Sequence, residues 1–369
     1  MIPRMTDARF AAARPVALAA AFLLVAAMAP EPASAAAAVK VVASLPNLGS
    51  IAHEIGGDRL DLTVIASGVQ DAHFVDPKPS YIVKLRAADL LLVNGLDLEI
   101  GWIPPLAQGA RNAKVVPGGA GYIDASTGIA VMEVPTGLSR AEGDVHPYGN
   151  PHYLGDPLNA ITVAQTIADA LKKADPAGAS TYEDRRKAFV ARLDQALFGK
   201  ELVDLAGGAK LEREAAAGTL DRFLDTPMGG APLKTKLGGW LGKLAPYRGR
   251  PILTYHKDAT YFASRFGLVV VDYVEPKPGI QPSARHLEEL TARLQHGDAK
   301  VLVTRPYNEH RSTDLLAQKT GVVVVTLPLE AGGDPKATDY FSLFDLVTER
   351  LAAALEQTGA AAAPAAGSR

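Results

Sequence analysis

The sequence predicts an α/β fold in which two βα lobes, each with a mainly parallel sheet, are joined by one long rigid helix. Short β-branched segments alternate with helical segments over 39–175 and again over 250–357, which predicts the lobes. Helical spacing of apolar residues in the charged stretch between them predicts the joining helix. Ligands of parallel sheets bind beyond the carboxyl ends of the strands, so we expect a site in the cleft between the lobes.

The amino terminus has the pattern of a secretory signal peptide. Three arginines precede the apolar run 15–30, and the segment EPASA at 31–35 ends in small residues. The run is short for a membrane span of about 20 residues, and a lipid anchor would need a cysteine, which the sequence does not contain. We therefore expect export, with residues 1–35 removed by cleavage near Ala35.

The first lobe is expected over 39–175. Apolar, β-branched segments bounded by turn residues predict its strands, and apolar residues at helical spacing predict its helices. The strands are expected at 39–45, 60–66 and 90–94, with weaker candidates at 114–116 and 129–132. The helices are expected at 47–56, 80–88 and 159–173.

The linking helix is expected over 176–205, where a helical pattern restarts after Asp175-Pro176. Scattered glycines and a Pro-Met-Gly-Gly turn indicate an insertion or mobile region over 206–249. The Ala/Pro/Gly-rich tail 358–369 is expected to be disordered. In the second lobe, strands are expected at 251–255, 268–273, 300–304 and 322–327, and helices at 259–266, 283–294, 311–320 and 339–355.

Composition narrows the function. The formal net charge is −2, so we expect no basic surface and no nucleic-acid partner. The sequence contains no cysteine, which excludes disulfides and thiolate ligands. Any metal site must therefore use histidine, aspartate, glutamate and backbone oxygens. We expect a monomer.

Three of the eight histidines stand where a ligand could be aimed at one point. His73 lies in a loop with two prolines after the second predicted strand, and His256 directly follows the first strand of the second lobe. His152 lies in the stretch GDVHPYGNPHYLGDP at 143–157, which can form neither a helix nor a strand interior and also contains His146. A rigid loop at a strand end can hold a metal ligand in place, so the set predicts a metal site.

Four motifs surround these histidines. They resemble, in this order, the motifs of the zinc/manganese class of ABC-transporter substrate-binding proteins, a helix-bridged two-lobe family also called metal-binding cluster A-I. The resemblance extends over nearly the whole chain after the predicted signal peptide. The motifs are HFVDPKPS at 73–80, NPHYLGDP at 150–157, YHKDATYFASRFGL at 255–268 and VEPKPGIQPS at 274–283.

This resemblance implies a periplasmic protein, not an enzyme, that captures Zn²⁺ and delivers it to an ABC transporter permease for import. The family's metal lies between the lobes, and its three histidine ligand positions match His73, His152 and His256. A separate periplasmic metallochaperone could load the site. Because one long helix makes a stiff hinge, the resemblance also implies that metal binding orders loops more than it swings the lobes.

The fourth ligand is where the sequence departs from the family. Many members place an aspartate just after the last strand of the second lobe, and the matching position here is Leu327. Glu330, three residues later, is our choice for the fourth ligand. Asp334, Asp339 and water are the alternatives, and Asp339 could instead be the N-cap of the last helix. His146 could be a neighbour of the site, an alternative ligand or a metal-capturing residue.

The donor set favours zinc over manganese. Three imidazoles with at most one carboxylate suit tetrahedral Zn²⁺, whereas Mn²⁺ prefers more oxygen ligands. Imidazole must be neutral to bind, so affinity should fall below about pH 6.5. The family's long His/Asp-rich loop is not evident, and the nearest equivalent is 142–152. The candidates for carboxylates that orient the imidazole rings are Asp71, Asp76, Asp156 and Asp258.

Three other functions would share the three-histidine site or the predicted fold. A zinc-dependent hydrolase could use a three-histidine site, but the sequence contains no HExxH or GxSxG motif and no suitably spaced carboxylate pair. A metal-binding adhesin or scavenger with the same fold stays open. A siderophore-binding protein would share the helix-bridged fold, but it would have no use for three loop histidines.

Overall fold

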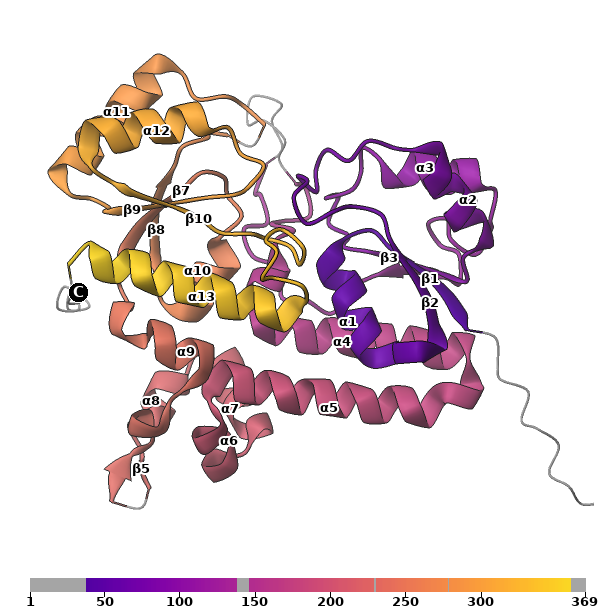
Figure 1. Ribbon diagram of the computed structural model, residues 1–369. Coiled ribbons are helices and arrows are strands. Elements are labelled where there is room, and N and C mark those ends of the chain that lie inside the picture. Colours follow the sequence, from indigo (N-terminus) through magenta and orange to yellow (C-terminus); the bar gives the residue numbers. More distant parts are fainter. Residues whose placement is uncertain (1–37, 138–145, 229, 278, 360–369) are drawn as a thin grey trace, which may run out of the picture. The chain divides into compact units, whose positions relative to one another are not determined.

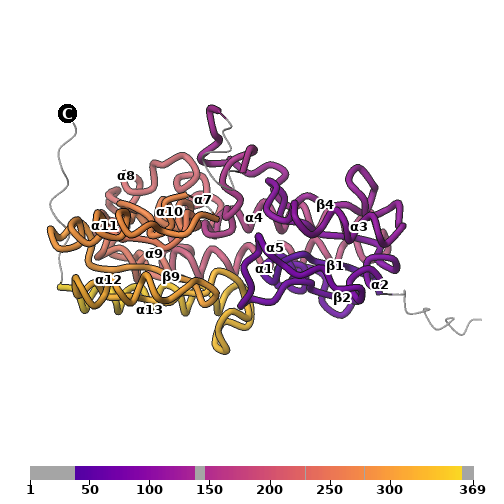
Figure 2. Tube along the Cα trace, turned by 90° about the horizontal axis from the view of Figure 1, so that it is seen from above, coloured from indigo at the N-terminus to yellow at the C-terminus, as the bar shows by residue number. Residues whose placement is uncertain are grey.

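The computed structural model describes residues 38–137, 146–228, 230–277 and 279–359. The predicted signal peptide and nearly all of the predicted tail lie outside these residues. Within them, helices alternate with strands that form two four-stranded parallel sheets, which confirms the predicted α/β class. Figures 1 and 2 show the two sheets on opposite sides of the molecule. Among the described residues, no helix has the length and apolar character needed to cross a bilayer.

The first sheet has the strand order β2-β1-β3-β4. Its inner strands are the most apolar because both of their faces are covered, and every residue of β3 (LLLV) is buried. The outer strand β2 is only partly buried. The strands are β1 (Val39–Ala43), β2 (Leu60–Val64), β3 (Leu90–Val93) and β4 (Tyr122–Asp124).

Helices cover both faces of this sheet. In the view of Figure 1, α2 (Pro79–Ala87) and α3 (Ile103–Ala110) lie above it and pack on each other. Below it, α1 (Pro46–Gly56) packs on α4 (Pro157–Ala174) and α5 (Ala179–Phe198). Each of α1 to α4 has proline in its first turn, where a missing N–H costs no hydrogen bond.

The second sheet has the order β10-β9-β7-β8. In Figure 1, α11 and α12 lie on one face and α10 and α13 on the other. The strands are β7 (Pro251–Thr254), β8 (Val269–Tyr273), β9 (Val301–Thr304) and β10 (Val323–Thr326). The helices are α10 (Thr260–Phe266), α11 (Ala284–His296), α12 (His310–Thr320) and α13 (Tyr340–Gln357).

The linking segment is less continuous than the sequence suggested. The short 3₁₀ turn Pro176–Gly178 precedes α5, and α5 ends at Gly199, whose φ of 87° a helix cannot contain. The helix α6 (Lys200–Ala206) then starts in a new direction. The predicted helix over 176–205 is therefore three elements. Of these, α5 contacts α9 (Gly239–Leu244), and α9 in turn contacts α13 of the second lobe.

Most of 206–249 is folded rather than irregular. Its glycines lie mostly at the starts and ends of short helices or in turns, and Leu211, Trp240 and Leu241 are buried in the main core. Trp240 Nε1 also donates a hydrogen bond of 2.7 Å to Asp345 Oδ1 on α13. The elements are α7 (Gly208–Ala216), α8 (Leu220–Leu224), β5 (Pro227–Met228), β6 (Ala231–Pro232), a 3₁₀ turn (Leu233–Lys236), α9 (Gly239–Leu244) and a 3₁₀ turn (Ala245–Tyr247).

Two weak strand predictions were wrong. Residues 114–116 and 129–132 contain no strand, and the edge position beside β3 is occupied by β4. The backbone turns back after 116, because Gly119 N donates to Val116 O and Gly121 N donates to Lys114 O. This turn brings 122–124, rather than 114–116, into register with the sheet.

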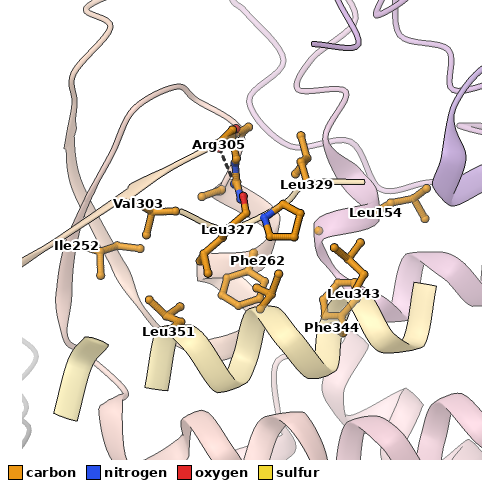
Figure 3. A pocket seen from close by; sticks show the side chains of 15 residues that line it. Leu154, Ile252, Phe262, Val303, Arg305, Leu327, Leu329, Leu343, Phe344 and Leu351 are labelled. Carbon is orange, nitrogen blue, oxygen red and sulfur yellow. Dashed lines mark hydrogen bonds and ion pairs between the residues drawn. The ribbon is translucent and has the colours of Figure 1, made fainter. Parts of the chain in front are cut away.

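A buried ion pair fixes the loops of the second lobe. Arg305, just after β9, donates two hydrogen bonds of 2.8 Å to the carboxylate of Asp258, and a third of 3.1 Å to the Leu327 carbonyl at the end of β10. Figure 3 shows Arg305 at one end of a mostly apolar cavity between α13 and the second sheet. Because Asp258 lies two residues beyond His256, this pair holds the loop that carries that histidine.

Candidate metal site

His73 is held by its own loop. Asp71 Oδ1 accepts a hydrogen bond from the backbone N–H of His73 (2.9 Å) and lies 2.7 Å from its ring Nδ1. Trp102 Nε1 anchors the loop by donating to the Ala72 carbonyl at 2.9 Å. With Nδ1 occupied by Asp71, Nε2 is the nitrogen that His73 offers to a ligand.

His152 lies where the first lobe meets the second. Asn150 Oδ1 accepts from the His152 backbone N–H (3.0 Å), and Asn150 Nδ2 donates to the carbonyl of Lys257 (2.9 Å). This asparagine therefore ties the loop of His152 to the loop of His256. The His152 side chain is buried, and its Nε2 has no hydrogen-bond partner among the residues that the structure describes. A buried polar atom without a partner is costly unless something binds it.

His256 lies at the carboxyl end of β7, opposite Glu275 at the end of β8. A register shift between Ile252 and Leu253 sets this pairing, and Glu275 N then donates to Tyr255 O at 2.9 Å. Glu275 Oε2 accepts a short hydrogen bond from His256 Nδ1. His256 is thus oriented by a carboxylate in the same way as His73.

The three imidazoles converge. One ring nitrogen from each of His73, His152 and His256 lies within 4.8 Å of the other two. The ring centroids are 5.3 Å apart for His73 and His152, 5.3 Å for His73 and His256, and 5.6 Å for His152 and His256. Zinc–nitrogen bonds of about 2.0–2.1 Å with tetrahedral angles place ligand nitrogens a little over 3 Å apart, so small ring movements suffice to hold an ion.

The surroundings shift the pKa values of His152 and His256 in opposite directions. Burial, and then the neighbouring histidines, hold the pKa of His152 well below its usual value, which keeps it neutral. Burial would also lower the pKa of His256, but its hydrogen bond to Glu275 and the charges of Asp258 and Asp71 outweigh it, and the pKa is raised. Protons therefore compete with a metal more strongly at His256 than at His152.

His146 is a fourth imidazole beside the group. Its Nε2 lies 3.0 Å from Nε2 of His73, with the ring centroids 5.1 Å apart. Burial is the main cause that lowers the pKa of His146 to about 4. The ring is neutral at ordinary pH and faces the nitrogen that His73 offers to a ligand.

Glu330 does not join the histidines, so the structure corrects our choice of fourth ligand. Its Oε2 accepts from the backbone N–H of Asn47 at 2.8 Å, and its carboxylate is outside the group of ligand atoms. The Asn47 side chain binds the same loop, donating to Leu329 O (3.0 Å) and accepting from Ala331 N (2.9 Å). These bonds turn the loop after β10 towards the first lobe and carry Glu330 with it.

The two other candidate carboxylates also have structural partners. Asp334 pairs with Arg350 at 2.6 Å. Asp339 caps α13, because its Oδ1 accepts from Ser342 N at 2.7 Å. Neither belongs to the group of converging ligand atoms among the described residues.

Of the four carboxylates proposed to orient imidazoles, only Asp71 does so. Asp76 is exposed, Asp156 pairs with Arg265 at 2.7 Å, and Asp258 pairs with Arg305. Glu275 was missed. It is the second residue of the fourth motif, VEPKPGIQPS, and comes just after a predicted strand, so the rule that identified His256 could have identified it.

Burial raises the pKa of Glu330 to about 8. Between the ordinary carboxyl pKa and this value the folded protein keeps a proton that the unfolded chain releases, so stability falls as pH rises. One such group lowers the unfolding free energy by at most about 1.4 kcal/mol per pH unit. Replacing Glu330 with glutamine should abolish this contribution. We expect urea unfolding at pH 5 to 8 to show that the unfolding free energy of the variant, relative to that of the wild type, increases as pH rises.

The same variant tests the ligand assignment. Glu330→Gln should leave zinc affinity unchanged, since the carboxylate lies outside the histidine group. A large loss of affinity with an unaltered pH profile of stability would restore Glu330 as a ligand.

A comparison with known families bears on this geometry. Residues 41–197 and 239–354 match the ZnuA family model, described as zinc-uptake complex component A periplasmic. The chain belongs to this family. The unmatched stretch between the two matches holds α6 to α8 and the β5–β6 hairpin.

Relatives of this ZnuA-family chain are named for several metals. It is 32% identical over 158 residues to the metal ABC transporter substrate-binding lipoprotein ScbA of Streptococcus cristatus, covering 42% of this chain and 48% of that one. It is 31% identical over 160 residues to the iron ABC transporter substrate-binding lipoprotein MtsA of Streptococcus pyogenes serotype M1, with the same coverage. The chain thus spans about half the length of the curated relatives it matches.

Solved structures share the fold. A ZnuA deletion mutant with zinc bound aligns with a TM-score of 0.64 at 23% identity, covering 89% of this chain and 100% of that one.

Proposed function

We propose that this protein is the substrate-binding component of a metal ABC transporter, and that it captures Zn²⁺ through His73, His152 and His256. The observation that carries the proposal is the convergence of three ring nitrogens within 4.8 Å of one another, together with a buried Nε2 of His152 that has no hydrogen-bond partner among the described residues. Membership of the ZnuA family and the names of the relatives support the same class of protein.

Zinc is our choice of metal because of the donor atoms. The group contains three imidazoles and no carboxylate, which suits tetrahedral Zn²⁺ better than Mn²⁺ or Fe²⁺. The relative named for iron and another named for manganese keep those metals as competitors to be tested.

A titration of the exported form tests this choice. We expect one equivalent of zinc per chain and an affinity for zinc at least about 100-fold above that for manganese, in line with the affinity order of divalent metals. Competition against a chromogenic chelator measures both constants. Manganese binding as tight as zinc binding would contradict the assignment of the metal.

The same proposal covers location and partners. We infer a periplasmic protein that delivers its ion to an ABC permease, consistent with the family description and with relatives named as transporter lipoproteins. A hydrolytic function is disfavoured by the position of the carboxylates. Asp71 contacts Nδ1 of His73, and Glu275 contacts Nδ1 of His256. Neither carboxylate is therefore free to act as a general base.

His146 is our proposal for the fourth ligand. It is neutral, and its Nε2 lies 3.0 Å from Nε2 of His73. Replacing His146 with alanine should weaken zinc binding about tenfold, equivalent to about 1.4 kcal/mol, because water can fill the vacated position. His310→Ala, at an exposed position, serves as the control. Unchanged affinity in the His146 variant would assign the fourth position to water.

A further inference from the structure

Glu275 connects a proposed metal ligand to the protein surface. Its Oε2 accepts from His256 Nδ1, and its Oε1 accepts from the backbone N–H of Gly279 at 2.8 Å. Both oxygens of this mostly buried carboxylate are therefore used, one on each side.

The hydrogen bond from Gly279 joins Glu275 to a turn of the backbone. Gly279 has a φ of 75°, a conformation that favours glycine, and Ile280 N donates to Lys277 O at 2.9 Å. The side chain of Ile280 is 42% exposed. The bond between Glu275 and Gly279 therefore lies one residue away from an apolar side chain on the surface.

Asp71 supports its histidine differently. Its Oδ1 contacts the ring and the backbone N–H of His73. Both of these contacts therefore stay within one loop. The two carboxylate–histidine pairs of the site are therefore not equivalent. Only the pair at His256 continues to an exposed segment.

We propose that Glu275 is a positioning residue that transmits metal occupancy at His256 to the backbone of Gly279 and Ile280. The inference rests on the proposed function. An ion bound to His256 fixes the ring and leaves Nδ1–H as a permanent donor to Glu275. The carboxylate is then fixed, and with it the acceptor for Gly279 N–H. Without the ion the same two hydrogen bonds form, but no bond to a metal fixes the ring, so the ring can rotate and the Gly279 bond is held less firmly.

The consequence is a surface that differs between loaded and empty protein. A transport partner that contacts Ile280 can distinguish the two forms without sensing the ion itself. This device requires no movement of the lobes.

Amide hydrogen exchange followed by NMR tests the coupling. In the wild type, zinc should slow exchange of the Gly279 and Ile280 amides at least about tenfold. Glu275→Gln keeps the size of the side chain but has one acceptor oxygen instead of two. It should bind zinc about 10–100-fold more weakly, and at saturating zinc it should not show this protection. Asp71→Asn, the matched control, should lose affinity to a similar degree yet keep the protection.

The outcomes separate the two proposals. Zinc binding by the wild type without slower exchange at Gly279 would overturn the coupling alone, as would full protection in saturated Glu275→Gln. A wild-type protein that binds no zinc would overturn the proposed function and the coupling together.

Discussion

Replacing His152 with alanine should lower zinc affinity by more than about 100-fold, because even residues that only orient a ligand typically contribute 10–100-fold. His152 is the sharpest of the three positions to test. Its Nε2 has no partner in the part of the chain that the structure describes, so the substitution breaks no hydrogen bond of that nitrogen there. The loss should therefore appear in metal binding far more than in the folding of the metal-free form.

Thermal or urea unfolding with and without zinc makes this visible. At a zinc concentration 1,000 times the dissociation constant, the wild type should gain about 4 kcal/mol of unfolding free energy, and a 100-fold weaker variant about 1.4 kcal/mol. His296→Ala is a suitable control, since His296 is exposed and bonds only to Asp298 among the described residues. Equal zinc stabilisation of wild type and His152→Ala would refute the three-histidine site.

Much of the fold was accessible from the sequence because apolar runs are strong signals where strands are buried on both faces. The segments at 90–94 and 300–304 lie on or within one residue of β3 and β9, every residue of which is buried. The edge strand β4 is only three residues long and partly buried, so it leaves little pattern to detect. The glycines of 206–249 were misleading, because glycine is common at helix boundaries and in tight turns as well as in irregular loops.

The candidate site was accessible for a related reason. Loops beyond the carboxyl ends of parallel strands are where ligands of such sheets bind, so the loop histidine His73 and the strand-end histidine His256 could be expected to face the same cleft. Glu330 could not be placed this way. It lies four residues beyond β10, where the hydrogen bonds of Asn47, distant in sequence, decide the direction of the loop. The position of Glu275 just after a predicted strand could be recognised from the sequence, but its contact with His256 depends on a shift in strand register that no sequence pattern predicts.

Replacing Arg305 with methionine should lower the unfolding free energy of the metal-free protein by about 3–5 kcal/mol, because it leaves the Asp258 carboxylate buried and unpaired. The two side chains are only 7% and 2% exposed, so water cannot substitute for the lost partner. The pair Lys200–Asp204 provides the contrast, with side chains 72% and 55% exposed. Lys200→Met should cost less than about 1 kcal/mol.

A double variant separates pairing from packing. Arg305→Met combined with Asp258→Leu removes both charges, and it should recover much of the stability, because the desolvation of two ions is avoided. The cavity beside Arg305 is lined mainly by apolar side chains, including Val303, Leu327 and Phe262, which favours an apolar replacement there (Figure 3). Urea unfolding of the four proteins measures each step. A cost for Arg305→Met no larger than that for Lys200→Met would mean that the loop carrying His256 is held by other contacts.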